Sequence, residues 1–308
     1  MSQLFSDLPP DRSFLETEKR NRNTEFLHKF SVEECVTAIN RENMAVLQAL
    51  ENAERSLAKF IVNVESRFRN GGRLIYVGAG TSGRLGVLDA SEIPPTFHEK
   101  PGRIVGIIAG GDSALRVSSE GKEDKHDGAR EELNRLMLTE NDTILGIAAG
   151  GSTPYVLGAL SYAKQKQQSI FTGLLSCTEV LRPENVDHLI VIPTGPEILT
   201  RSTRMKAGTA TKLALNTIST TLMIRMGKVY ENLMIDVKAT NDKLRDRAAR
   251  IIASLTGLNR KRSFELLTFA GGSVKTAVVM HKCSLSQKEA ETVLQASGNR
   301  LDTVLEKL

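Results

Sequence analysis

Short apolar runs that alternate with longer helical stretches constrain the fold of this chain more than any other feature. The runs are Leu74–Val77, Ile104–Ala109, Thr143–Ala148, Ile170–Leu175 and Leu189–Ile192. They lack strict polar–apolar alternation, which is typical of strands buried on both faces of a sheet. Helices are expected between them, at about 82–92, 113–138, 153–168 and 199–227. We therefore predict an α/β fold with a doubly wound parallel sheet of five strands and helices on both faces.

The 308 residues are enough for about two domains, and three regions differ in character. Residues 1–60 are expected to form an N-terminal arm followed by helices, with a capping box at Ser31 and Glu34. Residues 61–230 hold the predicted sheet. Residues 231–308 carry charged stretches of helical period with breaks at glycines, so we expect a small helical bundle there.

Composition argues against several classes of protein. The net charge is +5, but acidic and basic residues interleave and Trp is absent, so no nucleic-acid surface is expected. The five histidines show no metal-binding spacing, and neither a metal nor another cofactor is expected. Cys35, Cys177 and Cys283 form no CxxC pair, which favours a reducing compartment. Because signal-peptide and membrane-spanning patterns are also missing, we expect a cytoplasmic protein without a membrane partner.

Small, hydroxyl-bearing loops follow three of the predicted strands. They occupy 77–83 (VGAGTSG), 108–113 (IAGGDS) and 148–153 (AAGGST). Ligands of open α/β sheets bind beyond the carboxyl ends of the strands, so these loops are expected to face one site. Backbone N–H groups at a helix start, with Thr and Ser hydroxyls, suit a phosphate group. No Walker lysine follows the loops at 77–83 and 148–153, which favours a phosphorylated small molecule over a nucleoside triphosphate.

The first loop has two other interpretations. Gly78, Gly80 and Gly83 match GxGxxG, the dinucleotide fingerprint. That fingerprint expects an acidic residue about 20 positions on, whereas the second run here ends about 30 residues on, in Gly110-Gly111. A tight strand–helix turn without any ligand is the other alternative. A fourth Ala-Gly-Gly-Ser copy at 270–273 is expected only to cap a helix.

Two glutamates, Glu92 and Glu123, are weaker candidates for functional residues than the loops are. Glu92 precedes Ile93-Pro94-Pro95, and we expect the helix to end there because proline cannot continue it. An exposed carboxylate at a helix end is the commoner interpretation of such a residue. Glu123 lies in the charged run 120–127, which is usually a solvated surface.

The chain resembles the bacterial N-acetylmuramic acid 6-phosphate etherases over nearly its whole length. The motifs are 15–21 (LETEKRN), 80–85 (GTSGRL), 89–97 (DASEIPPTF), 107–111 (IIAGG), 120–124 (EGKED), 149–154 (AGGSTP) and 199–209 (LTRSTRMKAGT). This resemblance implies a sugar isomerase (SIS) domain at about 61–227, with a flavodoxin-like, five-stranded parallel sheet that binds phosphosugars. It also implies a homodimer that needs no metal.

The resemblance further implies a carbon–oxygen lyase of cell-wall recycling. Its substrate is a phosphorylated amino sugar, N-acetylmuramic acid 6-phosphate, and its products are N-acetylglucosamine 6-phosphate and D-lactate. By motif, Glu92 is the proton donor and Glu123 the second catalytic residue. Substrate contacts are expected at Gly80, Thr81, Ser82, Gly83, Ser152 and Thr153.

Three other functions stay open. A phosphosugar aldose–ketose isomerase is the alternative enzyme, and it would release no lactate. A non-catalytic phosphosugar sensor similar to the glucokinase regulatory protein would carry two SIS domains in a longer chain. A sugar-responsive transcription factor would need a helix-turn-helix ahead of the SIS domain, and residues 1–60 are too acidic and polar to suggest one.

The separation of Ser82 and Glu92 adds a geometric expectation. A continuous helix of ten residues rises about 15 Å, which is more than a hexose phosphate spans. Either the helix ends early and residues 90–95 fold back, or Glu92 serves a site whose phosphate loops belong to the other subunit. We favour an active site near the dimer interface.

Overall fold

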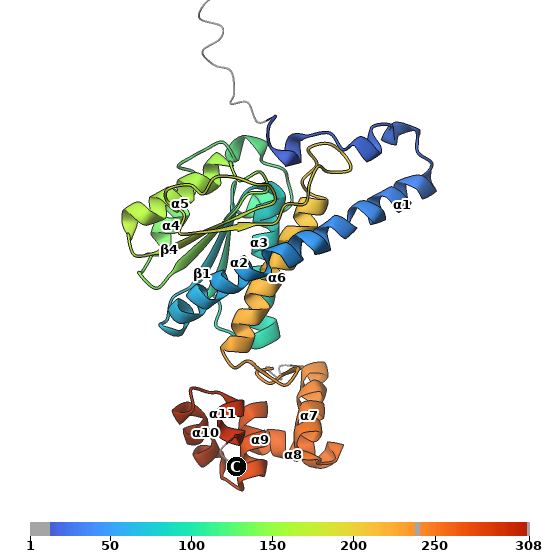
Figure 1. Ribbon diagram of the computed structural model, residues 1–308. Coiled ribbons are helices and arrows are strands. Elements are labelled where there is room, and N and C mark those ends of the chain that lie inside the picture. Colours follow the sequence, from blue (N-terminus) through green and yellow to red (C-terminus); the bar gives the residue numbers. More distant parts are fainter. Residues whose placement is uncertain (1–12, 238–240, 307–308) are drawn as a thin grey trace, which may run out of the picture. The chain divides into compact units, whose positions relative to one another are not determined.

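The computed structural model describes residues 13–237 and 241–306, which divide into two compact units (Figure 1). The first unit comprises Met1–Asp89 and Val105–Asn216, and the second comprises Ala90–Ile104 and Thr217–Leu308. The prediction that no signal peptide is present concerns the first twelve residues, which lie outside the described residues. The three-part division at residues 60 and 230 stays a prediction.

A five-stranded sheet forms the middle of the first unit. Its strands are β1 (Leu74–Gly78), β2 (Ile104–Ile108), β3 (Thr143–Ile147), β4 (Phe171–Ser176) and β5 (His188–Val191). They lie in the order β2-β1-β3-β4-β5, and β3 pairs in parallel with both β1 and β4, as β4 does with β5. This is the flavodoxin-like order, which reverses between β1 and β3. The predicted fold class is confirmed, and each strand lies within one residue of its predicted run.

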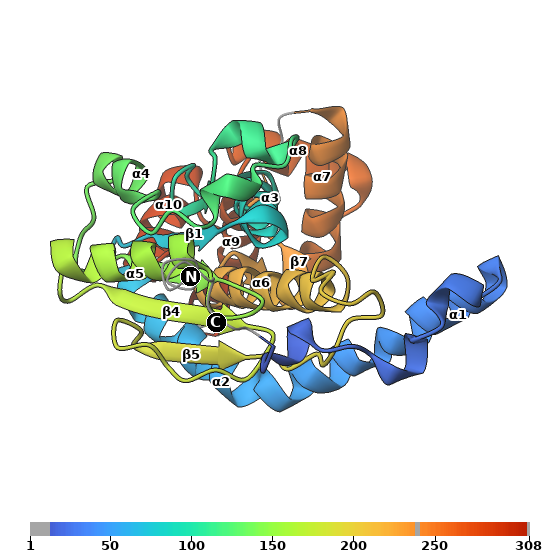
Figure 2. The ribbon, with the colours of Figure 1, turned by 90° about the horizontal axis from the view of Figure 1, so that it is seen from above.

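Helices cover both faces of this sheet. Successive side chains of a strand point to opposite faces, and every residue of β1, β3 and β4 is buried. On one face, Ile144 belongs to a core with residues of α5 (Pro154–Lys166). On the other face, Leu145 pairs with Gly173, and Phe60 of α2 (Met44–Arg69) packs against that glycine. A Cβ at Gly173 would lie only 2.6 Å from the Phe60 ring. Figure 2 shows α2 and α5 on opposite sides of β4 and β5.

The helix that follows β1 is longer than expected. α3 runs from Gly80 to Phe97 and contains both Pro94 and Pro95, so the predicted end at Glu92 is wrong. Proline lacks the N–H that would bond the carbonyl four residues earlier, but its fixed φ near −65° is itself helical. The last turn therefore accommodates both rings with two fewer helical hydrogen bonds. His98, in the left-handed conformation (φ 50°), follows the helix.

The single helix predicted for 113–138 is also wrong. This stretch forms the short 3₁₀ helices η4 (Asp112–Leu115) and η5 (Glu120–Lys122), then α4 (Arg130–Arg135). Its middle is charged and contains glycines, so it has no continuous apolar stripe to pack as one helix. Long-range bonds hold it as loops instead: the Ser119 hydroxyl donates to the carbonyl of Ala109 (3.1 Å), and the Tyr155 N–H donates to that of Glu123 (2.9 Å).

The N-terminal region is attached to the first unit by side-chain hydrogen bonds. It comprises η1 (Glu16–Glu18), η2 (Arg22–Thr24), η3 (Leu27–Lys29) and α1 (Val32–Glu42), with the predicted capping box at Ser31 and Glu34 present. The Glu16 N–H donates to Thr178 Oγ1 (3.3 Å), and the Thr24 hydroxyl donates to the carbonyl of Ile198 (2.8 Å). The expected arm thus lies against the loops that follow β4 and β5. The final helix of this unit's chain, α6 (Lys206–Arg225), continues into the second unit.

A helical bundle makes up most of the second unit, as predicted. After the short hairpin β6 (Val229–Tyr230) and β7 (Leu233–Met234), the helices are α7 (Asp242–Thr256), α8 (Arg260–Phe269), α9 (Val274–Cys283), α10 (Gln287–Ala296) and α11 (Leu301–Leu305). α9 contacts each of the other four, and its Ala277, Val278 and Val279 are fully buried. The Ser273 side chain caps α9, as expected of the fourth small-residue loop. Across 13–237 and 241–306, no helix combines the length and apolar character that crossing a membrane requires.

Candidate active site

A pocket of about 240 Å³ opens at the carboxyl ends of β1 and β3, within the first unit. Segments far apart in the sequence meet around it. Its lining residues are Leu15, Thr17, Glu18, Ala79, Gly80, Thr81, Ser82, Glu123, Asp124, Ile147, Ala149, Gly150, Ser152, Thr153, Pro154, Arg201 and Thr203. The pocket lies next to the point where the strand order reverses, which is where ligands of doubly wound sheets bind.

The start of α3 forms one wall of this pocket. Gly80, Thr81 and Ser82 are the first residues of the helix, so their N–H groups precede its hydrogen-bonded turns. The positive end of the helix dipole and two half-buried hydroxyls face the same space, a combination that favours an anion. Gly80 has a φ of 53°, a conformation open to glycine without strain.

Gly83 contributes to the packing beneath this wall. A Cβ at Gly83 would lie 2.6 Å from Cγ1 of Ile108 and 2.7 Å from the carbonyl oxygen of Gly78. Only a residue without a side chain therefore lets α3 begin so close to β1 and β2. The structure buries Gly83 and places it outside the pocket lining given above.

The loop before α5 forms the opposite wall. Ser152 and Thr153 are half-buried, and Thr153 occupies the N-cap position with Pro154 as the first helical residue. The Thr153 side chain makes no capping bond within the described part of α5, so its hydroxyl is available to a ligand. Of the three loops expected to face one site, 77–83 and 148–153 line this pocket, whereas no residue of 108–113 is among its lining residues.

Glu123 lies between these walls and is held there by α5. Its carbonyl accepts the Tyr155 N–H, and its exposed side chain lines the pocket with Asp124. The following residues press on the same helix: a Cβ at Gly158 would lie only 1.7 Å from the carbonyl oxygen of His126. The backbone position of Glu123 is therefore set by close packing, although its surroundings in sequence resemble an ordinary charged surface.

Sequence reasoning missed five polar residues of this pocket: Thr17, Glu18, Asp124, Arg201 and Thr203. Arg201 has a φ of 70°, uncommon for a residue with a side chain, and its Nε lies 3.0 Å from Oε2 of Glu18. A guanidinium is well suited to binding phosphate. Both segments belong to the motifs 15–21 and 199–209, which were the available signal for a role at the site.

Glu197 fixes the loop that carries Arg201. Its fully buried carboxylate accepts the N–H groups of Lys206 and Ala207, both at 2.9 Å, and so caps the start of α6. Burial raises the pKa of Glu197 above its usual range, although these two bonds oppose the shift. The loop between Glu197 and Lys206 is thus closed at its base by a carboxylate that faces no solvent.

Glu92 belongs to the second unit, where its side chain is exposed on α3. Because α3 is continuous from Gly80 to Phe97, the expectation of an early helix end followed by a fold-back is wrong. The alternative, that Glu92 serves a site whose loops come from another subunit, stays a prediction. So does its assignment as proton donor.

Comparisons with known proteins find relatives over nearly the whole length of the chain. Residues 56–164 match a family model described as the glucokinase regulatory protein N-terminal SIS domain. The chain is 46% identical to an N-acetylmuramic acid 6-phosphate etherase of Prochlorococcus marinus (strain MIT 9303), over 99% of this chain and 98% of that one. It is 45% identical to the protein of the same name from Bacillus subtilis (strain 168), over 95% and 96%. Phosphoheptose isomerase from Neisseria gonorrhoeae aligns with a TM-score of 0.42 and 16% identity, over 62% of this chain and 98% of that one.

Proposed function

Because the chain belongs to the N-acetylmuramic acid 6-phosphate etherase family, we propose that it is a carbon–oxygen lyase acting on the lactyl ether of N-acetylmuramic acid 6-phosphate. The products are N-acetylglucosamine 6-phosphate and D-lactate. Identity near 45% over almost the full length of both chains carries this proposal. It favours the etherase over an aldose–ketose isomerase and over a phosphosugar-sensing regulator.

The sugar phosphate is assigned to the start of α3. Gly80, Thr81 and Ser82 offer N–H groups at the helix start, and Ser152 and Thr153 line the same pocket. Arg201 can add a positive charge by exchanging its contact with Glu18 for one with the phosphate. Binding at the phosphate then places the sugar chain beside Glu123.

The chemistry requires a base and an acid. In the open-chain sugar, the C2 proton is acidified by the neighbouring C1 aldehyde, and Glu123 removes it. The electron pair forms a C2–C3 double bond while the C3–O bond breaks, and Glu92 protonates the departing lactyl oxygen. Water then adds its oxygen to C3 and a proton returns to C2, so the sum is one ether and one water converted to one alcohol and one lactate. The two carboxylates exchange roles between the steps.

A homodimer is supported by an amphipathic helix that leaves apolar side chains exposed on one face. α1 has no buried residue, and Val32 and Val36, one turn apart on the same face, are 76% and 53% exposed. Met44 and Leu47, at the start of α2, are 72% and 66% exposed. Adjacent apolar side chains of this kind mark interaction surfaces. We assign the second copy of the chain as the occupant of this face.

The subunit arrangement bears on Glu92. A continuous helix between Ser82 and Glu92 rises about 15 Å, which supports an active site that combines the loops of one subunit with the Glu92 of the other. We also assign the reaction to cytoplasmic recycling of cell-wall amino sugars. The free thiols of Cys35, Cys177 and Cys283 are compatible with that reducing compartment.

The test measures D-lactate released from N-acetylmuramic acid 6-phosphate by the wild type and by Glu92→Gln and Glu123→Gln. Each substitution is expected to lower the rate by about 10²–10⁴-fold, the usual contribution of a positioned acid or base. Glu131→Gln, an exposed glutamate that pairs with Arg135 on α4, is the matched control and should keep the normal rate. Normal lactate release by both Glu92→Gln and Glu123→Gln would refute the assignment, and absence of lactate with the wild type would point to the isomerase.

A further inference from the structure

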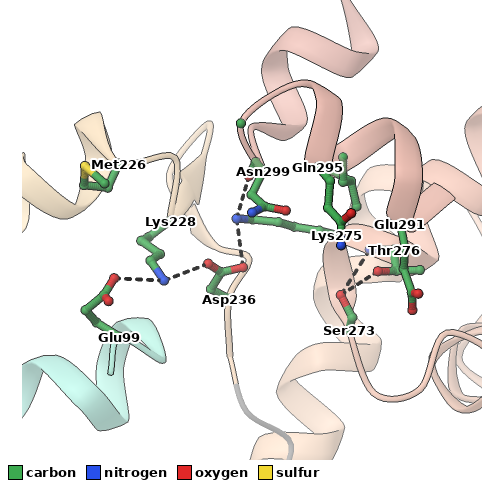
Figure 3. A pocket seen from close by; sticks show the side chains of 12 residues that line it. Glu99, Met226, Lys228, Asp236, Ser273, Lys275, Thr276, Glu291, Gln295 and Asn299 are labelled. Carbon is green, nitrogen blue, oxygen red and sulfur yellow. Dashed lines mark hydrogen bonds and ion pairs between the residues drawn. The ribbon is translucent and has the colours of Figure 1, made fainter. Parts of the chain in front are cut away.

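Four charged side chains of alternating sign connect distant segments of the second unit (Figure 3). Glu99 Oε2 lies 3.1 Å from Lys228 Nζ, which lies 3.2 Å from Asp236 Oδ2. Asp236 Oδ1 lies 2.9 Å from Lys275 Nζ, which also donates to the carbonyl of Asn299 (2.9 Å). We refer to Glu99, Lys228, Asp236 and Lys275 as the ion-pair chain.

The ion-pair chain joins the end of α3 to the core of the helical bundle. Glu99 is the second residue after α3, Lys228 precedes β6 and Asp236 follows β7. Lys275 lies in the first turn of α9, the helix that contacts all four others of the bundle. Figure 3 shows Asp236 between the two lysines, with Lys228 and Glu99 on one side of it and Lys275 on the other.

These are not ordinary surface ion pairs. The side chains of Lys275, Glu99, Lys228 and Asp236 are only 7%, 12%, 16% and 20% exposed. They line a pocket of about 370 Å³ together with polar residues of α9 and α10. Exposed pairs contribute little to stability, whereas removing one partner of a buried pair leaves a charge without compensation. Loss of Asp236 would remove the carboxylate between the two lysines: Lys275 would lose its pair with Asp236, and Lys228 would keep only its pair with Glu99.

Two prolines weaken the hydrogen bonding of the last turn of α3. Pro94 and Pro95 remove two hydrogen bonds from its last turn, so contacts outside the helix must hold that turn in place. Glu92 lies five residues before the helix end at Phe97, and Glu99 lies two residues after it. A shift of Glu99 is therefore transmitted to Glu92 through less than two turns of helix.

We propose that the ion-pair chain positions Glu92 for proton transfer to the leaving lactyl oxygen. Glu99, Lys228, Asp236 and Lys275 are thus positioning residues, and the inference rests on the proposed etherase function. It predicts a selective defect: protonation of the leaving group fails, while proton removal at C2 by Glu123, in the first unit, continues.

The experiment separates these two steps. N-acetylmuramic acid 6-phosphate is incubated in D₂O, and lactate release is compared with deuterium incorporation at C2 of the recovered substrate. Asp236→Asn should lower lactate release about tenfold or more, since misplacement by about 1 Å can cost 10²-fold, and should change C2 exchange less than about threefold. Glu92→Gln should show the same imbalance. Asp236→Glu, which keeps the charge, should recover most of the lactate release.

Asp246→Asn is the matched control. Asp246 lies on α7 in the same unit and pairs with two exposed arginines, Arg250 of α7 and Arg260 of α8. This variant should leave both rates unchanged. If Asp236→Asn folds poorly, Glu99→Gln gives the same test at the other end of the ion-pair chain, next to α3. The inference is overturned if exchange and release fall by the same factor, or if Asp236→Asn behaves as Asp246→Asn while Glu92→Gln is defective. If the wild type releases no lactate, the proposed function itself fails.

Discussion

Replacing Gly158 by alanine tests whether the position of Glu123 depends on the packing of its segment against α5. The new Cβ would lie 1.7 Å from the carbonyl oxygen of His126 and 2.6 Å from its carbon, whereas ordinary contact begins at 3.4 Å. The His126 carbonyl must therefore withdraw by about 1.7 Å, the difference between the two oxygen distances. Glu123 is three residues away and bonded to the same helix, so it must move as well.

The expected magnitudes follow from this displacement. Overpacking costs about 1–3 kcal/mol, and alanine recovers about 1 kcal/mol of helix propensity, so the free energy of unfolding should fall by up to about 2 kcal/mol. Misplacing a reacting group by more than 1 Å should lower lactate release about 10²-fold. Urea unfolding and the lactate assay measure the two effects.

Gly121→Ala provides the control for Gly158→Ala. Gly121 lies in the same segment, and nothing lies within 4 Å of the place its Cβ would occupy. This variant should keep both stability and activity near those of the wild type. If Gly158→Ala released lactate as fast as Gly121→Ala, the argument that α5 packing positions Glu123 would be refuted.

Two further changes test the core and the proposed dimer. Burial raises the pKa of Asp142, but hydrogen bonds from Arg73 and Thr139 outweigh it and hold this pKa below its usual range. The resulting stabilisation is present above the unfolded pKa near 3.9 and is lost as pH falls through the lower folded value. Asp142→Asn should therefore cost about 3 kcal/mol at pH 7, and its difference from the wild type in urea unfolding should shrink below about pH 4. Val36→Glu, on the exposed face of α1, should shift the chain from dimer to monomer in sedimentation equilibrium without changing its helix content, and an unchanged mass would contradict the assigned interface.

The sheet was predictable because its signal is local. Each strand is a short apolar run that needs no knowledge of its neighbours, and the loops 77–83 and 148–153 each follow one of these runs directly. The parallel arrangement brings all carboxyl ends to one edge and so favours their meeting in one pocket, although the loop after β2 at the same edge does not join them. That part of the candidate site could be predicted from the residues before any coordinates were known.

The remaining site residues depend on contacts that are distant in the sequence. Arg201 reaches the pocket because Glu197 closes its loop, and Thr17 because its segment bonds to the loops after β4 and β5. Neither pairing leaves a periodic trace in the sequence. Glu123 stands in a run of charges that is indistinguishable from solvated surface until Tyr155 and Gly158 are known to press against it.

Pro94 and Pro95 show a different limit. Proline is a strong signal for the end of a helix because it lacks the backbone N–H donor and its ring clashes with the carbonyl four residues earlier. The final turn of α3 tolerates both effects. The position of these prolines within the last four residues of α3 decides the outcome, and that position is known only when the true end at Phe97 is known.

Each compact unit is assembled from two separate stretches of chain, and this has a consequence for biosynthesis. Residues 90–104 emerge from the ribosome before 105–216 and long before 217–308, with which they form the second unit. Ile93 and Phe97, which are 4% and 6% exposed in the folded chain, must therefore wait for the C-terminal helices to be translated. Such contacts between distant segments close late and slow folding. A ribosome that stopped after Asn216 would release all five strands of the sheet without residues 217–308, the larger part of the second unit.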